Sequence, residues 1–191
     1  VRISEWANSH CHNFTPLEID ENTIRVYFQI RDKINLQELS LFIDISVIDN
    51  CKVIYIHDKP VLDLEKIGTF DDSGANICSV IRERNLISMY YIEWNPSTTV
   101  QQKLVGLAIS EDNGYTFKRL YDGPILDRNK DEPYYIGVVD VIKERNNLNT
   151  IILVVQNDMV NKDIISYYAI SENGIDCERQ NIDCILPDDA N

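Results

Sequence analysis

Short apolar runs rich in Ile, Val, Tyr and Leu alternate with polar turn residues along most of the chain. In its middle third these runs occupy residues 76–82, 86–94, 103–109 and 115–120. The last turn contains Asn113-Gly114, a pair that supplies the positive φ angles of a tight hairpin at little steric cost. No segment shows a sustained apolar period of 3.6 residues over a helical length. The pattern therefore predicts an all-β fold built from antiparallel hairpins.

This pattern repeats with a spacing slightly above 60 residues. The run Val80-Ile81-Arg82-Glu83-Arg84-Asn85 returns 61 positions later as Val141-Ile142-Lys143-Glu144-Arg145-Asn146. Ala108-Ile109-Ser110-Glu111 returns at the same spacing as Ala169-Ile170-Ser171-Glu172, and Asn22–Phe28 precedes Asn85–Tyr91 by 63 positions. We therefore expect three copies of one unit, at roughly residues 1–63, 64–127 and 128–191.

Tandem four-stranded antiparallel sheets bury both faces by stacking on their neighbours, which is the arrangement of β-propeller blades. A side-by-side sandwich is the alternative, but it does not require so regular a repeat. Closed propellers have roughly 4–8 blades, whereas three copies account for nearly all of this chain. We therefore expect a single propeller domain over residues 1–191 that is incomplete, or that closes with a partner. The absence of an initiator Met at Val1 favours the first option.

The composition is that of a globular protein, with 44% hydrophobic and 26% charged residues. No run of about 18 apolar residues predicts a transmembrane helix, and the first residues do not resemble a secretory signal. The five cysteines form no C-x-x-C pair, so neither a zinc site nor a disulfide framework is indicated. Reduced thiols in a cytoplasmic protein fit this distribution best.

The net charge of −13 comes from 31 acidic against 18 basic residues. An acidic surface repels phosphate backbones and anionic lipids, so we expect neither nucleic acid nor a membrane as a partner. The chain contains no Gly-rich phosphate loop, no Ser-His-Asp order and no HExxH motif, and we expect no cofactor and no metal. The oligomeric state stays open, a homo-oligomer included.

Carboxyl groups fall at matching places in two of the repeats. Aligning the copies sets Asp71 opposite Glu132, with Asp72 beside Asp71. Because the loops that enter the first strand of each blade meet at one end of a propeller, these acids would face one cavity. Paired carboxyl groups can protonate a leaving oxygen and activate water or stabilise an oxocarbenium-like state, as glycosyl transfer and hydrolysis require. The alternative is that they are surface acids in turns.

Several segments, taken in order, resemble a known superfamily. They are Gly68-Thr69-Phe70-Asp71-Asp72-Ser73-Gly74, Met89-Tyr90-Tyr91-Ile92-Glu93-Trp94-Asn95, Gly106–Asp112, Gly123-Pro124-Ile125-Leu126 and Glu132-Pro133-Tyr134. The chain is similar to the five-bladed propellers related to arabinanases, levansucrases and invertases, and most of all to an uncharacterised bacterial branch associated with surface-polysaccharide gene sets. The resemblance implies a five-bladed propeller that cleaves or transfers glycosidic bonds.

The resemblance also implies roles for the acids. Asp71 or Asp72 would orient the acid and stabilise the transition state, and Glu132 would donate the proton. The hydrolases of this superfamily need a third acid on the first blade, but the corresponding residues 8–13 contain no Asp or Glu. His10 or His12 could serve as the base, or an incoming group could replace it in phosphorolysis or transfer. The fold could also bind a glycan without catalysis.

Other side chains are candidates for contacts with a carbohydrate ligand. His10 and His12 alternate, so on a strand they face the same side, although ordinary hydrogen bonding is the alternative. Trp94 and Tyr134 could cover the C–H face of a sugar, or could pack between blades. Arg31 could reach the channel or form a surface ion pair. We therefore expect a carbohydrate-active propeller, and whether it is an enzyme or a non-catalytic glycan-binding scaffold stays open.

Overall fold

A computed structural model of the chain describes residues 9–34, 37–94, 104–130, 135–143, 150–158 and 163–185. Within the third sheet it describes side chains at 139–143 and 168–180. The described residues form strands, turns and bridges, and none of them belongs to a helix that is long and apolar enough to cross a membrane. The expectation of a cytoplasmic protein stays a prediction.

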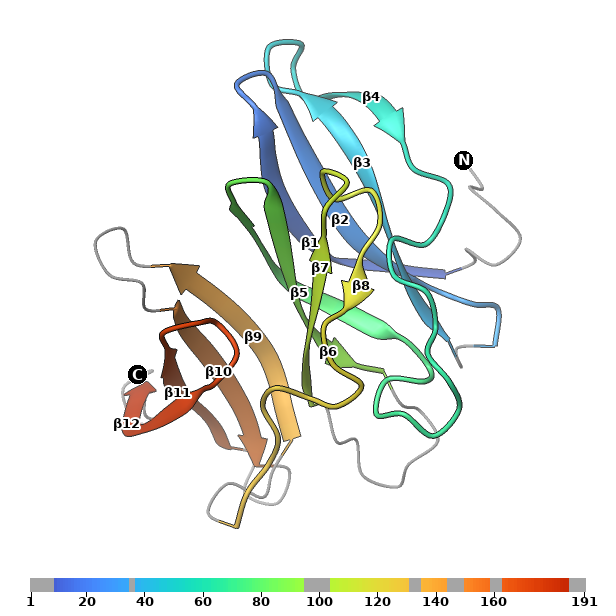
Figure 1. Cartoon of the computed structure of the whole chain (residues 1–191). Helices are drawn as coiled ribbons and strands as arrows, with labels where there is room; N and C mark the ends of the chain where they lie inside the picture. The colour runs from blue at the N-terminus through green and yellow to red at the C-terminus, as the bar shows by residue number, and fades with distance from the viewer. Residues whose placement is uncertain are drawn as a thin grey trace.

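The strands form three separate four-stranded antiparallel sheets, each in simple chain order (Figure 1). The first contains β1 (Ser9–Asp20), β2 (Thr23–Arg31), β3 (Glu38–Ser46) and β4 (Lys52–Ile56). The second contains β5 (Ala75–Glu83), β6 (Leu86–Glu93), β7 (Val105–Ser110) and β8 (Lys118–Arg119). The third contains β9 (Tyr135–Lys143), β10 (Thr150–Asp158), β11 (Asp163–Ser171) and β12 (Glu178–Ile185). We call them the first, second and third blade.

The strand pattern read from the sequence agrees with these sheets. The runs at 76–82, 86–94 and 103–109 correspond to β5, β6 and β7, and each sheet falls inside one of the three repeat units. The run at 115–120 is the exception, because only Lys118–Arg119 pair as β8. Residues ahead of this pair belong to a turn that the Asp112 side chain closes, as described below.

The first strands of successive blades lie next to one another, β1 against β5 and β5 against β9 (Figure 1). A hydrogen bond of 2.6 Å from Asn13 Nδ2 to Asn76 Oδ1 connects β1 with β5. The Ser79 hydroxyl donates to the Val141 carbonyl at 3.5 Å and connects β5 with β9. This is the arrangement expected of strands that line the centre of a propeller.

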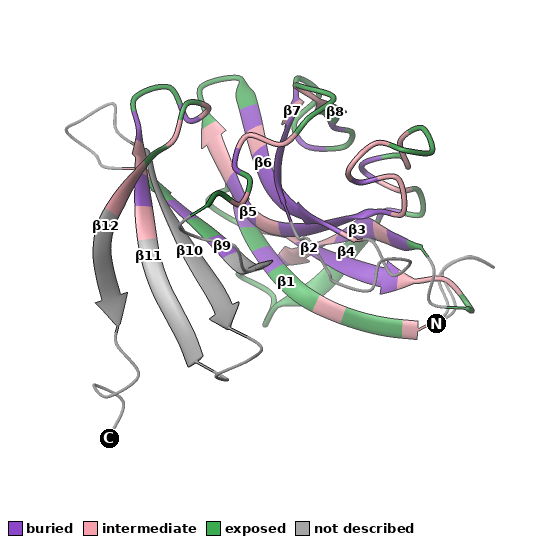
Figure 2. Cartoon of the chain, turned by 90° about the horizontal axis from the view of Figure 1, so that it is seen from below, coloured by how far each residue is buried: buried purple, intermediate pink, exposed green. Residues whose placement is uncertain are grey.

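Many residues of β2, β3, β6 and β7 are buried (Figure 2), and buried apolar side chains form clusters between neighbouring blades. Successive residues of a strand point to opposite faces of its sheet, and β6 shows the consequence. Met89 and Tyr91 pack against the first blade, whereas Tyr90 and Ile92 pack against the third. Each buried side chain of this size contributes about 1.5–3 kcal/mol. The middle blade is therefore stabilised on both of its faces.

A tyrosine on the second strand of each of the first two blades reaches into a turn of the next blade. Tyr27 on β2 donates to the Gly114 carbonyl at 2.9 Å, and Tyr90 on β6 donates to the Gly174 carbonyl at 3.1 Å. Burial raises the pKa of each phenol to about 12. Both hydroxyls therefore stay protonated as donors, and the same contact recurs at consecutive blade interfaces.

A buried ion pair reinforces the first of these interfaces. The Arg25 guanidinium donates to both carboxylate oxygens of Asp44, at 2.8 and 2.9 Å, and to the Asn113 carbonyl at 2.8 Å. It also lies 3.7 Å from the ring centre of Phe42 and 4.4 Å from that of Tyr115. The charge is thus fully partnered, as burial of an arginine requires.

The turn that receives Tyr27 is organised by the carboxylate of Asp112. It accepts hydrogen bonds from the Ser110 hydroxyl, from the backbone amides of Tyr115 and Thr116, and from the Thr116 hydroxyl, at 2.7–3.1 Å. Partial burial would raise the pKa of Asp112, but these hydrogen bonds outweigh it and lower the pKa below its ordinary value. The ionised carboxylate therefore stabilises the turn.

Replacing Asp112 with Ala should lower the free energy of unfolding at pH 7 by about 1–3 kcal/mol, because several donors lose their acceptor. The folded-state pKa of Asp112 is lowered, so this stabilisation is present above the ordinary pKa of 3.8 and is lost as the pH falls through the folded value. Urea unfolding of both proteins at pH 7 and near pH 3 measures the difference, which should shrink in acid.

The exposed Asp122 supplies the control, because Asp122→Ala should change the free energy of unfolding by less than about 0.5 kcal/mol at either pH. Equal effects of the two substitutions would contradict the assigned role of Asp112.

Candidate functional site

Three elements of two blades meet at Gly74, immediately ahead of β5. The Glu38 amide donates to the Ser73 carbonyl at 3.0 Å, and the Trp94 amide donates to the Gly74 carbonyl at 2.9 Å. Glu38 and Gly74 also form a parallel β-bridge. A Cβ atom at Gly74 would lie 2.1 Å from the Glu38 carbonyl oxygen, and the φ angle of 137° is itself unfavourable for other residues. Glycine is therefore required for this contact.

Glu38 stands at the centre of a small polar group, which we call the Glu38 cluster, formed with His12, Arg31 and Trp94. The Glu38 side chain is 0% exposed, and its Oε1 lies 2.7 Å from His12 Nε2. Its Oε2 lies 3.8 Å from Arg31 Nε, and Arg31 and Glu38 are direct cross-strand partners in the β2–β3 register. A buried carboxylate needs such partners to offset the loss of hydration.

Arg31 joins the carboxylate to an aromatic surface. Its guanidinium carbon lies 4.0 Å from the ring centre of Trp94, within the range of a cation–π contact. The buried Nε1 atom of Trp94 has no hydrogen-bond partner among the described residues. An indole with an unused N–H donor beside charged groups is suited to a hydroxylated ligand.

The backbone of β1 is distorted where it delivers His12 to the cluster. His10 and Asn13 have positive φ angles of 55° and 51°, and the pairing with β2 is irregular on both sides of His12. The buried Gln29 amide supports this distortion, because its nitrogen donates to the carbonyls of His12 at 3.0 Å and Asn13 at 2.9 Å. Its oxygen accepts from the Ile77 amide at 2.8 Å. Such local strain persists only where surrounding contacts hold it.

The structure brings together three of the residues predicted from the sequence, namely His12, Arg31 and Trp94. His10 does not join them, because its side chain is exposed and bonds to the Ser9 hydroxyl at 2.8 Å. Glu132 and Tyr134 lie outside the described residues, so their predicted roles stay predictions.

Asp71 is fully buried and is engaged within the protein. Its Oδ2 accepts from Arg119 Nε at 2.6 Å, and Arg119 also donates to the Asp63 carbonyl at 2.8 Å. Burial, followed by the nearby Asp71 carboxylate, raises the pKa of Tyr91 in the same group. The Gly74 amide donates to the Asp71 carbonyl at 3.1 Å. Asp71 thus belongs to the loop that contacts Glu38, but its carboxylate pairs with Arg119.

Asp72 is half-buried, and both of its carboxylate oxygens accept hydrogen bonds inside the same loop. The donors are the Gly68 amide and the Ser73 hydroxyl, each at 2.9 Å. The carboxylate therefore stabilises the entry to β5 in this structure, and it retains partial access to the surface.

Glu38 is the member of the cluster that sequence reasoning missed. The first-blade acid was expected within residues 8–13, which overlap the start of β1, whereas Glu38 begins β3. A usable signal was present, because Arg31 and Glu38 flank the short segment 32–37 and an antiparallel hairpin sets such residues opposite each other. A carboxylate at the start of the apolar run Leu39–Ile43 is the second part of that signal.

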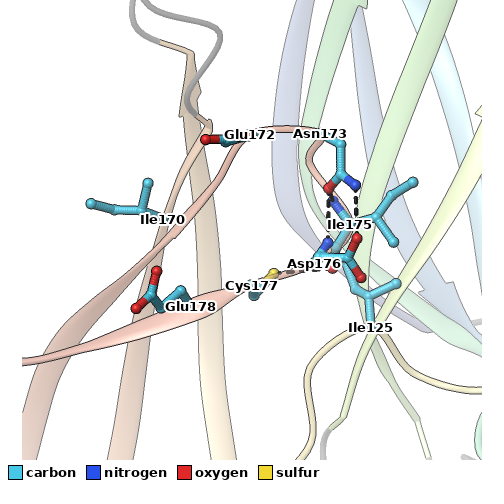
Figure 3. A pocket seen from close by; sticks show the side chains of 8 residues that line it. All are labelled: Ile125, Ile170, Glu172, Asn173, Ile175, Asp176, Cys177 and Glu178. Atoms are coloured by element: carbon cyan, nitrogen blue, oxygen red, sulfur yellow. Dashed lines mark hydrogen bonds between the residues drawn. The ribbon is translucent and has the colours of Figure 1, made fainter.

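A different hollow, with a volume of about 680 Å³, lies at the interface of the second and third blades (Figure 3). Ile125 and the turn between β11 and β12 line it, and its acidic groups are Glu172, Asp176 and Glu178. Burial raises the pKa of its Cys177 thiol to about 11, which keeps the thiol protonated. Over the described ranges, no group of three His, Cys, Asp or Glu residues is arranged to hold a metal ion.

Relatives of this chain are known from sequence. Two uncharacterised proteins from two strains of Mycobacterium tuberculosis are each 32% identical to it over 142 residues, which is 73% of this chain and 46% of each relative. The chain thus spans about half the length of the curated relatives it matches. No family model matches it.

Similar solved structures have little sequence in common with the chain. A family 117 glycoside hydrolase of the marine bacterium Zobellia galactanivorans matches 88% of the chain and 45% of its own length, with a TM-score of 0.68 and 13% identity. The chain has the fold of the β-propeller glycoside hydrolases. This confirms the predicted all-β propeller and, for the fold, the resemblance noted in the sequence.

Two further structures give the same result. Fructan 1-exohydrolase IIa from Cichorium intybus matches 91% of the chain and 32% of its own length, with a TM-score of 0.66 and 10% identity. A thermostable family-43 glycoside hydrolase matches 93% and 53%, with a TM-score of 0.62 and 15% identity. Identities this low establish the propeller fold and leave the reaction to be argued from the residues.

Replacing Asp71 with Asn should lower the free energy of unfolding by about 3 kcal/mol, because it leaves the nearly buried Arg119 guanidinium without its closest counter-charge. Chemical denaturation at pH 7 measures this loss. The control is Asp63→Asn in the same segment, whose exposed side chain should matter by less than about 0.5 kcal/mol. Unchanged stability of Asp71→Asn would show that Asp71 has no structural role in this pair.

Proposed function

We propose that the Glu38 cluster forms one wall of a carbohydrate-binding cleft, and that the protein cleaves or transfers glycosidic bonds there. The observation that supports this most is the position of the cluster, at the end of the blades where β1 and β5 begin. Asp71 and Asp72 lie in the loop ahead of β5, and in this proposal Glu132, which precedes β9 in the sequence, joins them at the same end. Charged groups, an indole face and the carboxyl groups would then surround one ligand.

The chemistry of the cluster suits a sugar. The Trp94 ring offers an apolar face for C–H groups, and its indole N–H can donate to a hydroxyl. Arg31 supplies further donors and His12 can supply an acceptor, while the enclosed Glu38 carboxylate contacts both of them. The propeller hydrolases described above share the fold that positions these groups. The acidic surface of the chain, with a net charge of −13, disfavours a nucleic acid as the alternative ligand.

In this proposal Glu132 donates a proton to the leaving oxygen as the bond to the anomeric carbon breaks. A second carboxylate stabilises the positive charge that develops on the sugar ring. Asp72 is the stronger candidate for direct contact, because it is half-buried, whereas Asp71 is fully buried and paired with Arg119. Asp71 would then act by holding the loop that carries Asp72.

A non-catalytic glycan-binding propeller is the second candidate. It is favoured by the internal hydrogen bonds that occupy both carboxylate oxygens of Asp72, and by the bond from Arg119 to Oδ2 of Asp71. The two functions differ in whether the protein has a turnover that the Glu132→Gln substitution removes, or only binds the glycan.

Screening the full protein against a glycan array, followed by product analysis on each bound glycan, tests the proposal. The Glu132→Gln variant should lose turnover by about 10²–10⁴-fold while keeping its affinity for the glycan, because it removes the acidic proton with little change of shape. Glu111→Gln, at an exposed turn of the second blade, is the matched control and should keep full turnover.

Full turnover in Glu132→Gln would rule out the assigned proton donor. Glycan binding without any product, in the wild type as in the variant, would establish the non-catalytic function. If the protein neither binds nor turns over any glycan on the array, the proposed carbohydrate function is wrong.

A further inference from the structure

The guanidinium of Arg31 has donors that no described protein group uses. Its Nε atom is buried and lies 3.8 Å from Glu38 Oε2, which is too long for a hydrogen bond. Within the described part of the chain, the Arg31 side chain contacts Glu38 and the Trp94 ring and forms no hydrogen bond. The side chain is 21% exposed. Its terminal nitrogens, Nη1 and Nη2, are therefore the donors left for a ligand.

Two fixed elements hold this guanidinium in place. Arg31 ends β2 and pairs directly with Glu38, the first residue of β3. Its guanidinium carbon lies 4.0 Å from the ring centre of Trp94, and the Trp94 amide donates to the Gly74 carbonyl at 2.9 Å. An arginine stacked on an aromatic ring keeps its planar fork of donors preorganised, so little side-chain entropy is lost when a ligand binds.

The negative charge of the cluster is enclosed, whereas its positive charge reaches the surface. The Glu38 side chain is 0% exposed, and that of Arg31 is 21% exposed. The neighbouring acid, Asp32, accepts a hydrogen bond from the Gln37 amide at 3.2 Å in the segment between β2 and β3. A ligand at this surface therefore meets the guanidinium before the Glu38 carboxylate, and an anionic group is attracted there.

We propose that the Arg31–Trp94 pair binds the carboxylate of an acidic sugar, so that the glycan of the proposed function, on which this inference rests, contains uronic acid units. The two terminal nitrogens of a guanidinium match the two oxygens of a carboxylate, and such charge-assisted bidentate pairs are strong. The Trp94 ring can cover the C–H face of the same sugar. The assignment does not depend on Glu132 as a proton donor.

A neutral sugar would use this surface less well. Glu38 is shared between two partners, because its Oε1 lies 2.7 Å from His12 Nε2 and its Oε2 lies 3.8 Å from Arg31 Nε. The charge of Arg31 is thus only partly offset by the protein. A carboxylate is planar, as the guanidinium is, and it supplies both the missing acceptors and the missing negative charge.

Binding of matched glycans to the full protein tests this assignment. The probes are oligosaccharides of hexuronic acids and the same oligosaccharides with their carboxyl groups reduced to primary alcohols, compared by isothermal titration calorimetry at pH 7. The wild type should bind the acidic form roughly 10–100-fold more tightly, because reduction removes the charge-assisted hydrogen bonds. Sulfated neutral oligosaccharides are the third probe and should bind more weakly than the acidic form.

Substitutions at Arg31 locate the preference. Arg31→Gln should bind the acidic and the reduced forms with affinities within about threefold of each other. Arg31→Lys should keep a smaller preference than the wild type, because lysine has the charge without the planar fork. The exposed Arg84, in the turn between β5 and β6, supplies the matched control, and Arg84→Gln should keep the wild-type preference.

The ratio of the two affinities separates ligand contact from a structural role, since a merely structural defect weakens binding of both forms alike. Arg31→Gln also removes a counter-charge from the buried Glu38. If that variant does not fold, Arg31→Lys and the wild type carry the test, because lysine keeps a positive charge beside Glu38.

Equal affinity of the wild type for the acidic and reduced forms, tighter binding of the sulfated form, or an unchanged preference in either Arg31 variant would overturn the assignment. If the wild type binds or cleaves only neutral glycans, the acidic-sugar assignment is wrong and the proposed function stands. If it binds no glycan of any kind and turns none over, both are wrong.

Discussion

The stacking of one sheet on the next is the constraint on which the rest of this structure depends. A four-stranded antiparallel sheet with apolar residues on both faces is not stable alone, because one face or both would remain in water. The second blade shows the solution, since Met89 and Tyr91 pack toward the first blade and Tyr90 and Ile92 toward the third. The repeated bonds from Tyr27 and Tyr90 to glycine carbonyls set how each pair of blades is aligned.

This stacking also decides which charges are buried and with what partners. Asp44 and Asp71 are each paired with an arginine that is itself nearly buried, so their charges are enclosed on all sides. Glu38 is enclosed to the same degree, but one of its partners, His12, reaches the surface. His12 therefore gives the Glu38 cluster a polar group at the surface, which the two enclosed ion pairs lack. This contrast distinguishes the Glu38 cluster from the other ion pairs.

The propeller scaffold leaves the chemistry to the side chains that it carries. It is shared with hydrolases at 10–15% identity, and identities this low establish the arrangement of the sheets alone. The blades bring loop residues to one end, and different side chains at that end give different chemistry.

The repeat spacing and the alternation of apolar residues were sufficient to predict three four-stranded blades, because strand period and hairpin turns are local properties of the chain. The predicted run at 115–120 failed for the same kind of reason, since the hydrogen bonds of Asp112 hold Tyr115 and Thr116 in a turn. His12, Arg31 and Trp94 were also identified from residue type and position.

Their common partner was not identified, and neither was the engagement of Asp71 with Arg119. Glu38 is cross-strand to Arg31, near His12 on another strand and against Gly74 of another blade. Such neighbours are set by strand register, by a distorted first strand and by the packing of one blade on the next. Those contacts join residues far apart in the chain, so they exist only once the sheets have stacked.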